Sequence, residues 1–234
     1  MRRFRGSDRD KGLTMIELLV AMTVFSIAVV LAFSAVIIVM QKSGDAQRSA
    51  DAQAELRIAL AQIDRQVRSG NVLFSPADET VPSDCEGVGS YSGTCMRIYT
   101  QSNGEQKCVQ WQLMEDPAAT TTPATYLLRT RSWDPGWATG GGAVSGWGVV
   151  ARGLHYVDGA DPATLEAGDT TPPFTLSTAI VSGGVTPYGD RMLVVHLESL
   201  DTRRDRPIAI DSSITGRNTS YGYNSGQCSP VPPA

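Results

Sequence analysis

An almost unbroken apolar run lies near the start of the chain, from Leu13 to Met40, and Glu17 is its only charged residue. As a helix that rises 1.5 Å per residue, the run is about 40 Å long, more than the ~30 Å of a bilayer core. A charged, unpaired carboxylate deep in a membrane costs about 2.5 kcal/mol or more. The pattern therefore predicts a membrane-spanning helix and requires a group that neutralises Glu17.

The sequence from Gln41 to Arg68 is polar but keeps a helical pattern, with many alanines and no proline. Its larger apolar residues recur on one helical face. They are Leu56, Leu60, Ile63 and Val67. Gly70-Asn71 is a typical helix stop. We therefore expect one helix from Leu13 to about Ser69, whose second half buries this stripe against the rest of the chain.

Beyond Gly70 the hydrophobic pattern has a period of two. Strands are expected at Cys95–Gln101, Gln106–Met114, Tyr126–Ser132, Gly148–Val157, Met192–Ser199 and Pro207–Ile214. Asn103-Gly104 predicts a tight hairpin between the first two. Segments rich in Pro, Gly, Ser and Thr, 158–187 among them, are expected as loops. The fold class is therefore α+β, with an antiparallel sheet wrapped on the amphipathic helix.

Charge and cysteines indicate on which side of a membrane the parts lie. The chain has 234 residues and a net charge of -4, which argues against a broad basic surface for nucleic acid. Five basic residues precede the apolar run: Arg2, Arg3, Arg5, Arg9 and Lys11. They keep that end in the cytoplasm, so everything after Met40 should lie outside. All 4 cysteines follow the run, which suggests two disulfides in an oxidising compartment.

Three interpretations compete for residues 1–40. A secretory signal peptide has a much shorter apolar core and a small-residue cut site, which this run lacks. A plain signal anchor has the right length. The third rests on the junction Lys11-Gly12-Leu13-Thr14-Met15-Ile16-Glu17, which resembles the cleavage and methylation motif of type IV prepilins and type II secretion pseudopilins. The resemblance implies a leader, residues 1–12, that a prepilin peptidase removes after Gly12. It also implies N-methylation of Leu13 and a role in filament assembly for Glu17.

The chemistry of the cut fits this resemblance. Cleavage after Gly12 creates an α-amino group on Leu13, a cation one helical turn before Glu17. The amine and the carboxylate pair either within one subunit or between adjacent subunits, and each pairing offsets the cost of burying a lone charge. The resemblance favours the pair between subunits, so that Glu17 sets axial register. The alternative places Glu17 near the headgroups, in contact with water.

Later segments are also similar to the minor-pilin group. They are Val149–Leu154 followed by Tyr156-Val157-Asp158, and the tail Ser213–Asn218 with its final Arg-Asn. Within that group the similarity is to the pseudopilin J and pilus assembly subunit W types. Major pilins often carry a proline midway through the helix, and none lies between Leu13 and Met40. The resemblance therefore implies a pilin-like fold and favours a minor or secretion-type subunit.

The cysteines allow three pairings. If Asn103-Gly104 is a two-residue turn, Cys108 lies opposite Tyr99 and Cys95 opposite Gln112, more than ~7 Å apart, which is too far for a bond. Two pairings remain, and Cys85–Cys95 with Cys108–Cys228 is preferred. The first closes a short Gly-rich loop, and the second ties down the Pro-rich C-terminus.

No catalytic constellation emerges from the residues. His155 and His196 lie in expected strands without other ligands at metal spacing. The acidic residues of one loop match no calcium-binding pattern, so a solvated loop is preferred over a calcium site; they are Asp158, Asp161, Glu166 and Asp169. Trp133 and Trp147 flank a Gly-rich loop and are expected to be partly exposed. We expect neither enzymatic activity nor a cofactor.

The sequence thus predicts a leader (1–12), a membrane or filament-core helix (13–40), its amphipathic continuation (41–70) and an extracytoplasmic sheet domain (71–234). The predicted function is that of a minor pilin or pseudopilin in a type IV pilus or type II secretion filament. It would reside in the cytoplasmic (inner) membrane as a single-pass protein and then join an extracytoplasmic filament. Expected partners are prepilin peptidase, other pilins, an inner-membrane assembly platform and lipid, with nucleic acid only in an uptake pilus. The alternatives are a DNA-uptake or adhesive tip subunit and a signal-anchored binding or enzymatic domain.

Overall fold

A long helix and an antiparallel sheet make up the structure, a computed structural model. It describes residues 14–76, 79, 93–101, 104–120, 125–156, 172–177, 180–181, 184–185, 192–201, 206–216 and 226–233. The described residues divide into two compact units between Arg48 and Ser49. Helix α1 (Met15–Ser69) contributes its first part to one unit, and its second part belongs with the sheet to the other. The predicted long helix and the α+β class are confirmed.

Helix α1 ends where the sequence predicts a stop. Ser69 is its last residue, and Gly70 follows as the first residue of strand β1 (Gly70–Leu73). A Cβ atom on residue 70 would lie 2.9 Å from Cγ2 of Ile98 and 3.1 Å from the carbonyl oxygen of Val67. Glycine therefore lets the chain leave the helix and enter the sheet this close to both neighbours.

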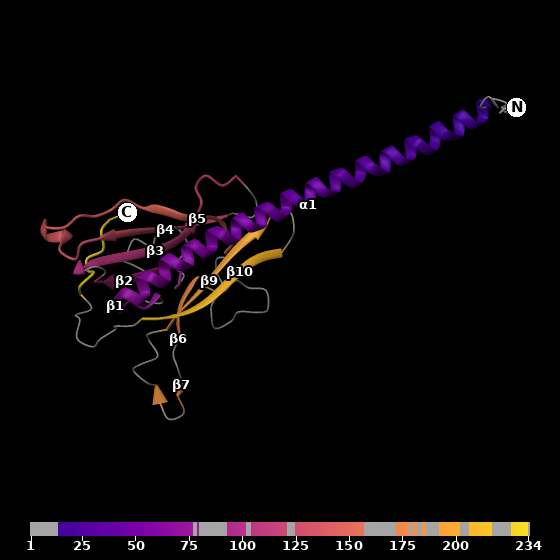
Figure 1. Cartoon of the computed structure of the whole chain (residues 1–234). Coiled ribbons are helices and arrows are strands. Elements are labelled where there is room, and N and C mark those ends of the chain that lie inside the picture. Colours follow the sequence, from indigo (N-terminus) through magenta and orange to yellow (C-terminus); the bar gives the residue numbers. More distant parts are fainter. Residues whose placement is uncertain are drawn as a thin grey trace, which may run out of the picture. The chain divides into compact units, whose positions relative to one another are not determined.

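The strands that follow pair antiparallel throughout the described residues. After β1 they are β2 (Cys95–Thr100), β3 (Lys107–Glu115), β4 (Tyr126–Trp133), β5 (Gly148–Leu154), β6 (Phe174–Ser177), β7 (Ile180–Val181), β8 (Gly184–Val185), β9 (Met192–Asp201) and β10 (Arg206–Thr215). The main sheet has the order β1-β2-β3-β4-β5-β9-β10, β6 also pairs with β9, and β7 and β8 form a separate ribbon. Figure 1 shows the second part of α1 lying across this sheet.

The hydrophobic core lies between that part of α1 and one face of the sheet. Leu56, Ala59, Ile63 and Val67 of the helix are at most 2% exposed, and Leu60 is partly buried against the same core. The sheet contributes alternate residues of its inner face, such as Met96, Ile98, Trp111, Leu193 and Val195. The indole nitrogen of Trp111 donates a hydrogen bond to the side-chain oxygen of Gln66. The predicted apolar stripe is therefore buried against the sheet.

The opposite face, here called the outer face, carries the residues that alternate with the core. Register places Tyr99 opposite Cys108, and Cys108 opposite Trp133. Next to them, Gln110 and Arg131 are at most 3% exposed, and Arg131 Nε donates to Gln110 Oε1 at 2.8 Å. Polar residues buried in this way show that the outer face is also covered.

The hairpin β2–β3 has the predicted register, with Cys95 opposite Gln112. The strands expected at Tyr126–Ser132, Met192–Ser199 and Pro207–Ile214 are confirmed as β4, β9 and β10, whereas two other parts of the strand prediction were wrong. Strand β1 was not expected, and segment 158–187, expected as a loop, contains β6, β7 and β8. Strand β6 is only 4 residues long and follows Pro172-Pro173, so it shows too little alternation to be recognised.

The strand expected over Gly148–Val157 ends at Leu154. Gly153 has a φ of +64°, which takes the backbone out of the extended region one residue before that end. His155 therefore follows β5 and does not lie within it, although its backbone N–H still donates to the carbonyl oxygen of Glu198 at 2.8 Å.

Candidate functional site

The first part of α1 exposes apolar side chains on every face. Its large apolar residues between Met15 and Met40 are exposed, from 49% for Val36 to 86% for Met15, except for Val29, which is partly buried. Among the described residues, α1 is the one helix long and apolar enough to cross a membrane. An apolar surface of this extent requires a covering of lipid or of other apolar helices.

The hydroxyl groups within this part of α1 are satisfied by the helix itself. The side chains of Thr23, Ser26 and Ser34 each donate to a backbone carbonyl one turn earlier, at 2.8 Å. Since no water is available in hydrocarbon, such internal bonds let a polar side chain enter it at small cost. These three residues are therefore compatible with an apolar environment.

Glu17 lies in the first turn of α1 and is exposed. Its backbone N–H donates to the carbonyl oxygen of Thr14 at 3.0 Å. No described residue forms an ion pair with its carboxylate, and the nearby predicted site residues, Gly12 and Leu13, lie outside the described residues. A negative charge here is favoured by the helix N-terminus, but it still needs a cation wherever the helix is surrounded by apolar groups.

The sheet domain contains the preferred disulfide. Cys108 of β3 and Cys228 are bonded, with their Cα atoms 5.6 Å apart. Cys95 is disulfide-bonded as well, and no described cysteine is free. The predicted partner of Cys95, Cys85, lies outside the described residues, so the pairing Cys85–Cys95 stays a prediction.

Tryptophans on and beside the outer face pack against arginines. Trp133 is 1% exposed, so the expectation that it is partly exposed was wrong: it packs in a cluster with Tyr99 and the disulfide. Trp147 is partly buried and lies under two guanidinium groups, 4.1 Å from Arg129 and 4.4 Å from Arg131. Burial lowers the pKa of Arg129 from its ordinary value. The arginines are thus held in fixed positions by ring stacking and by hydrogen bonds to glutamines.

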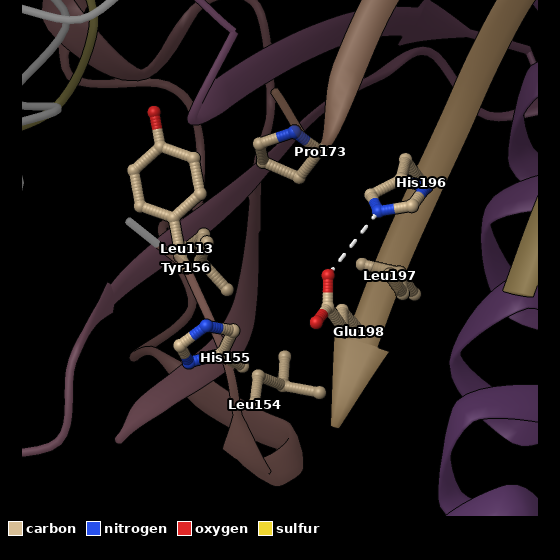
Figure 2. Close-up of a pocket in the computed structure, with 8 residues that line it drawn as sticks. All are labelled: Leu113, Leu154, His155, Tyr156, Pro173, His196, Leu197 and Glu198. Atoms are coloured by element: carbon tan, nitrogen blue, oxygen red, sulfur yellow. Dashed lines mark ion pairs between the residues drawn. The ribbon is translucent and has the colours of Figure 1, made fainter. Parts of the chain in front are cut away.

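The two histidines line one small cavity, which the sequence did not predict (Figure 2). It measures about 10 Å³, close to what one water molecule needs. His196 Nε2 lies 3.6 Å from a carboxylate oxygen of Glu198, and its Nδ1 contacts Asp211 on β10. His155 Nδ1 is buried without a hydrogen-bond partner in the structure.

Among the described residues, no group of three or more His, Cys, Asp or Glu is arranged to hold a metal ion. The four acidic residues considered for calcium lie outside the described residues. The features that point to a function are therefore the exposed apolar part of α1, up to Met40, and Glu17, the one carboxylate within that part.

Comparison with known proteins agrees with this location. Residues 7–33 match a family model described as the prokaryotic N-terminal methylation motif. The match spans the predicted cleavage position, Glu17 and the apolar run as far as Phe33. No curated protein and no solved structure matches the chain.

Proposed function

We propose that the chain is a minor pilin or pseudopilin, because it carries a prepilin-type N-terminal methylation motif. Such a motif implies that a prepilin peptidase processes the chain and that the chain assembles with other pilins. Its place would be a type IV pilus or a type II secretion filament. The single observation that carries the proposal is the position of this motif: it lies at the N-terminal end of a long helix whose apolar side chains are not covered by other described parts of the chain.

One apolar N-terminal helix fits an inner-membrane anchor. In the proposed life cycle, lipid covers the first part of α1 until an assembly platform transfers the subunit into a filament. Equivalent helices of neighbouring subunits then replace lipid as the covering. Both environments are apolar, so the transfer leaves the hydrophobic free energy of this surface nearly unchanged. The sheet domain stays outside the membrane in both states.

Glu17 makes the free energy of this transfer depend on the axial position at which the subunit enters the filament. Removal of residues 1–12 would place the α-amino group of Leu13 one turn from the Glu17 carboxylate. In lipid the pair can form within one subunit, and in the filament the same carboxylate can accept the amine of an incoming subunit. A buried charge that finds its partner at only one axial offset selects that offset. The chain itself performs no chemistry in this role and needs no cofactor.

The test is the substitution Glu17→Val in cells that contain the complete assembly system. Insertion and cleavage should persist, because the span becomes more apolar and the peptidase acts at Gly12. Incorporation into filaments should fall at least about tenfold, because the incoming amine is buried without a partner. The measurement compares membrane-inserted with filament-associated protein, and methylation is checked separately by mass spectrometry.

Leu18→Val is the matched control, since it changes the volume of a neighbouring side chain without changing charge. It should assemble like the parent protein. Equal filament incorporation of Glu17→Val and parent would remove the register role. Absence of the parent chain itself from purified filaments would reject the proposed function.

A further inference from the structure

The segment Gly226–Pro233 lies on the outer face of the sheet and is held there by more than the disulfide. Side-chain donors bond four of its carbonyl groups, each at 2.8 Å. They are Arg97 Nη1 to Cys228, Trp137 Nε1 to Pro230, Arg131 Nη2 to Pro232 and Arg131 Nη1 to Pro233. These bonds reach five residues beyond the cysteine, so the contact is a row of separate interactions along the segment.

Donors and acceptors are complementary along this row. Proline has no backbone N–H, so the stretch from Pro230 to Pro233 offers four carbonyl acceptors but only the N–H of Val231. Guanidinium and indole groups donate hydrogen bonds and accept none. A segment of this composition cannot extend a sheet, which needs both groups. Donor-only side chains are the surface that suits it.

The shape of the segment is set by its prolines. Val231 and Pro232 each precede a proline, which disfavours helical backbone and favours extended or polyproline II backbone, whereas the bond between Ser229 and Pro230 is cis. Pro230 and Pro233 stand at the P-x-x-P spacing that aromatic-lined grooves bind in polyproline recognition. Here Val231 and Cys228 pack with aromatic rings, which are Tyr99, Trp133 and Trp137.

The donors are held in place by contacts outside the segment. Arg131 also bonds Gln110 and stacks at 4.4 Å on Trp147. Arg97 pairs with Glu79 at 2.8 Å and lies 4.1 Å over the ring of Phe74. Since such side chains lose little further freedom on binding, the groove is preorganised for its ligand.

We propose that this groove, formed by Arg97, Arg131, Trp133 and Trp137, is a binding site for proline-rich peptides. Ser229–Pro233 is its own ligand, and the Cys108–Cys228 bond is the tether. The tether keeps the local concentration of the ligand high, so the oxidised chain excludes other peptides from the groove.

The first experiment offers the ligand from outside. The host is the chain truncated after Gln227 and carrying Cys108→Ser, with its N-terminal helix retained, in detergent micelles. The probe is a fluorescein-labelled peptide, Ser-Pro-Val-Pro-Pro-Ala, and binding is followed by fluorescence anisotropy. We expect saturable binding to this host and none to the intact, oxidised chain. A peptide with alanine in place of all three prolines should not bind.

Substitutions in the host distinguish specific recognition of the peptide from nonspecific adsorption. Trp137→Phe keeps the ring but loses one donor, which should weaken binding about five- to tenfold. Arg131→Lys loses the two-pronged donor and should weaken it at least as much. Arg152→Gln is the control, because Arg152 of β5 pairs with Asp116 and not with the segment; it should leave binding within about twofold. A host with the near-ultraviolet circular dichroism of the parent that fails to bind the peptide, or that binds the alanine peptide equally, overturns the proposal.

A second measurement tests the proposal in a chain that is not truncated, and it decides the question if the truncated host does not fold. It follows hydrogen exchange of the Trp137 indole N–H, which donates to Pro230, in the otherwise intact Cys108→Ser/Cys228→Ser chain. If the groove binds the segment, exchange of this N–H stays at least tenfold slower than in a short tryptophan peptide, and Arg131→Lys accelerates it. Exchange at the rate of that peptide would show that only the disulfide holds the segment, and the proposal would fail.

Discussion

Helix α1 is one element with two different surfaces. In the first part, the large apolar side chains up to Met40 are at least 49% exposed except for the partly buried Val29. In the second part, Leu56, Ala59, Ile63 and Val67 are at most 2% exposed. The second part presents a single apolar stripe, and the sheet of the same chain covers it. The first part is apolar all round, and no single sheet face can cover every side of a helix.

The difference shows where each part finds its partner. A stripe is matched to one surface, and here the chain provides that surface itself. An all-round apolar helix needs a medium or several neighbours, which means lipid or other copies of such a helix. Stability of the folded domain and assembly into a filament should therefore depend on different halves of α1. The predictions below test that separation, from the largest expected effect to the smallest.

The largest effect concerns processing. Gly12→Glu places a bulky charge just before the predicted cut and should abolish cleavage, so that the leader stays attached and filament incorporation is lost. The sheet domain should unfold at the parent's urea concentration, because the change lies outside it. N-terminal sequencing of membrane protein decides the first point. Finding Leu13 as the free N-terminus in this variant would refute the assigned cleavage position.

The second effect is confined to the sheet domain. Cys108→Ser with Cys228→Ser removes the bond that closes a loop of 120 residues. The free energy of unfolding should fall by about 2–5 kcal/mol, mainly because the unfolded chain is no longer constrained. All 4 tryptophans follow Ser49, so their fluorescence during urea unfolding reports on this domain alone. Membrane insertion should be unchanged, and reduced insertion would contradict the separation of the two halves.

Sequence reasoning succeeded where the pattern is long and local. The apolar run, the stripe with its stop at Gly70, and the β2–β3 register all follow from periodicity or turn residues. It failed where tertiary contacts decide. Strand β6 is defined by its pairing with β9, and the meeting of His155 with His196 depends on how β5 and β9 approach each other. Trp133 is buried because it packs with Cys228 and Val231, about a hundred residues later in the chain, and a local sequence pattern cannot predict such a contact.

The third prediction applies one substitution to both halves of α1. Leu56→Ala removes a side chain that is 1% exposed and should lower the free energy of unfolding by about 2–5 kcal/mol through lost burial and a cavity. Leu31→Ala removes one that is 64% exposed in the chain and should change that free energy by less than about 0.5 kcal/mol. The same fluorescence assay in detergent compares them. Equal destabilisation by the two would mean that the halves are energetically coupled.

The smallest effect tests how specifically the second half is bound to the sheet. The indole N–H of Trp111, a residue with no exposed surface, donates to Gln66 of α1, and Gln66→Leu removes the acceptor while nearly preserving volume. A buried donor left without a partner costs about 1–3 kcal/mol, so the domain should lose that much of its free energy of unfolding. Gln62→Leu, one turn earlier on the same helix, is the matched control and should change it by less than about 0.5 kcal/mol. Filament incorporation should be the same for both variants below the unfolding transition, because neither alters the first half of α1. If Gln66→Leu were neutral, the helix would be held to the sheet by hydrophobic burial alone, and the hydrogen bond would not define its register on the sheet.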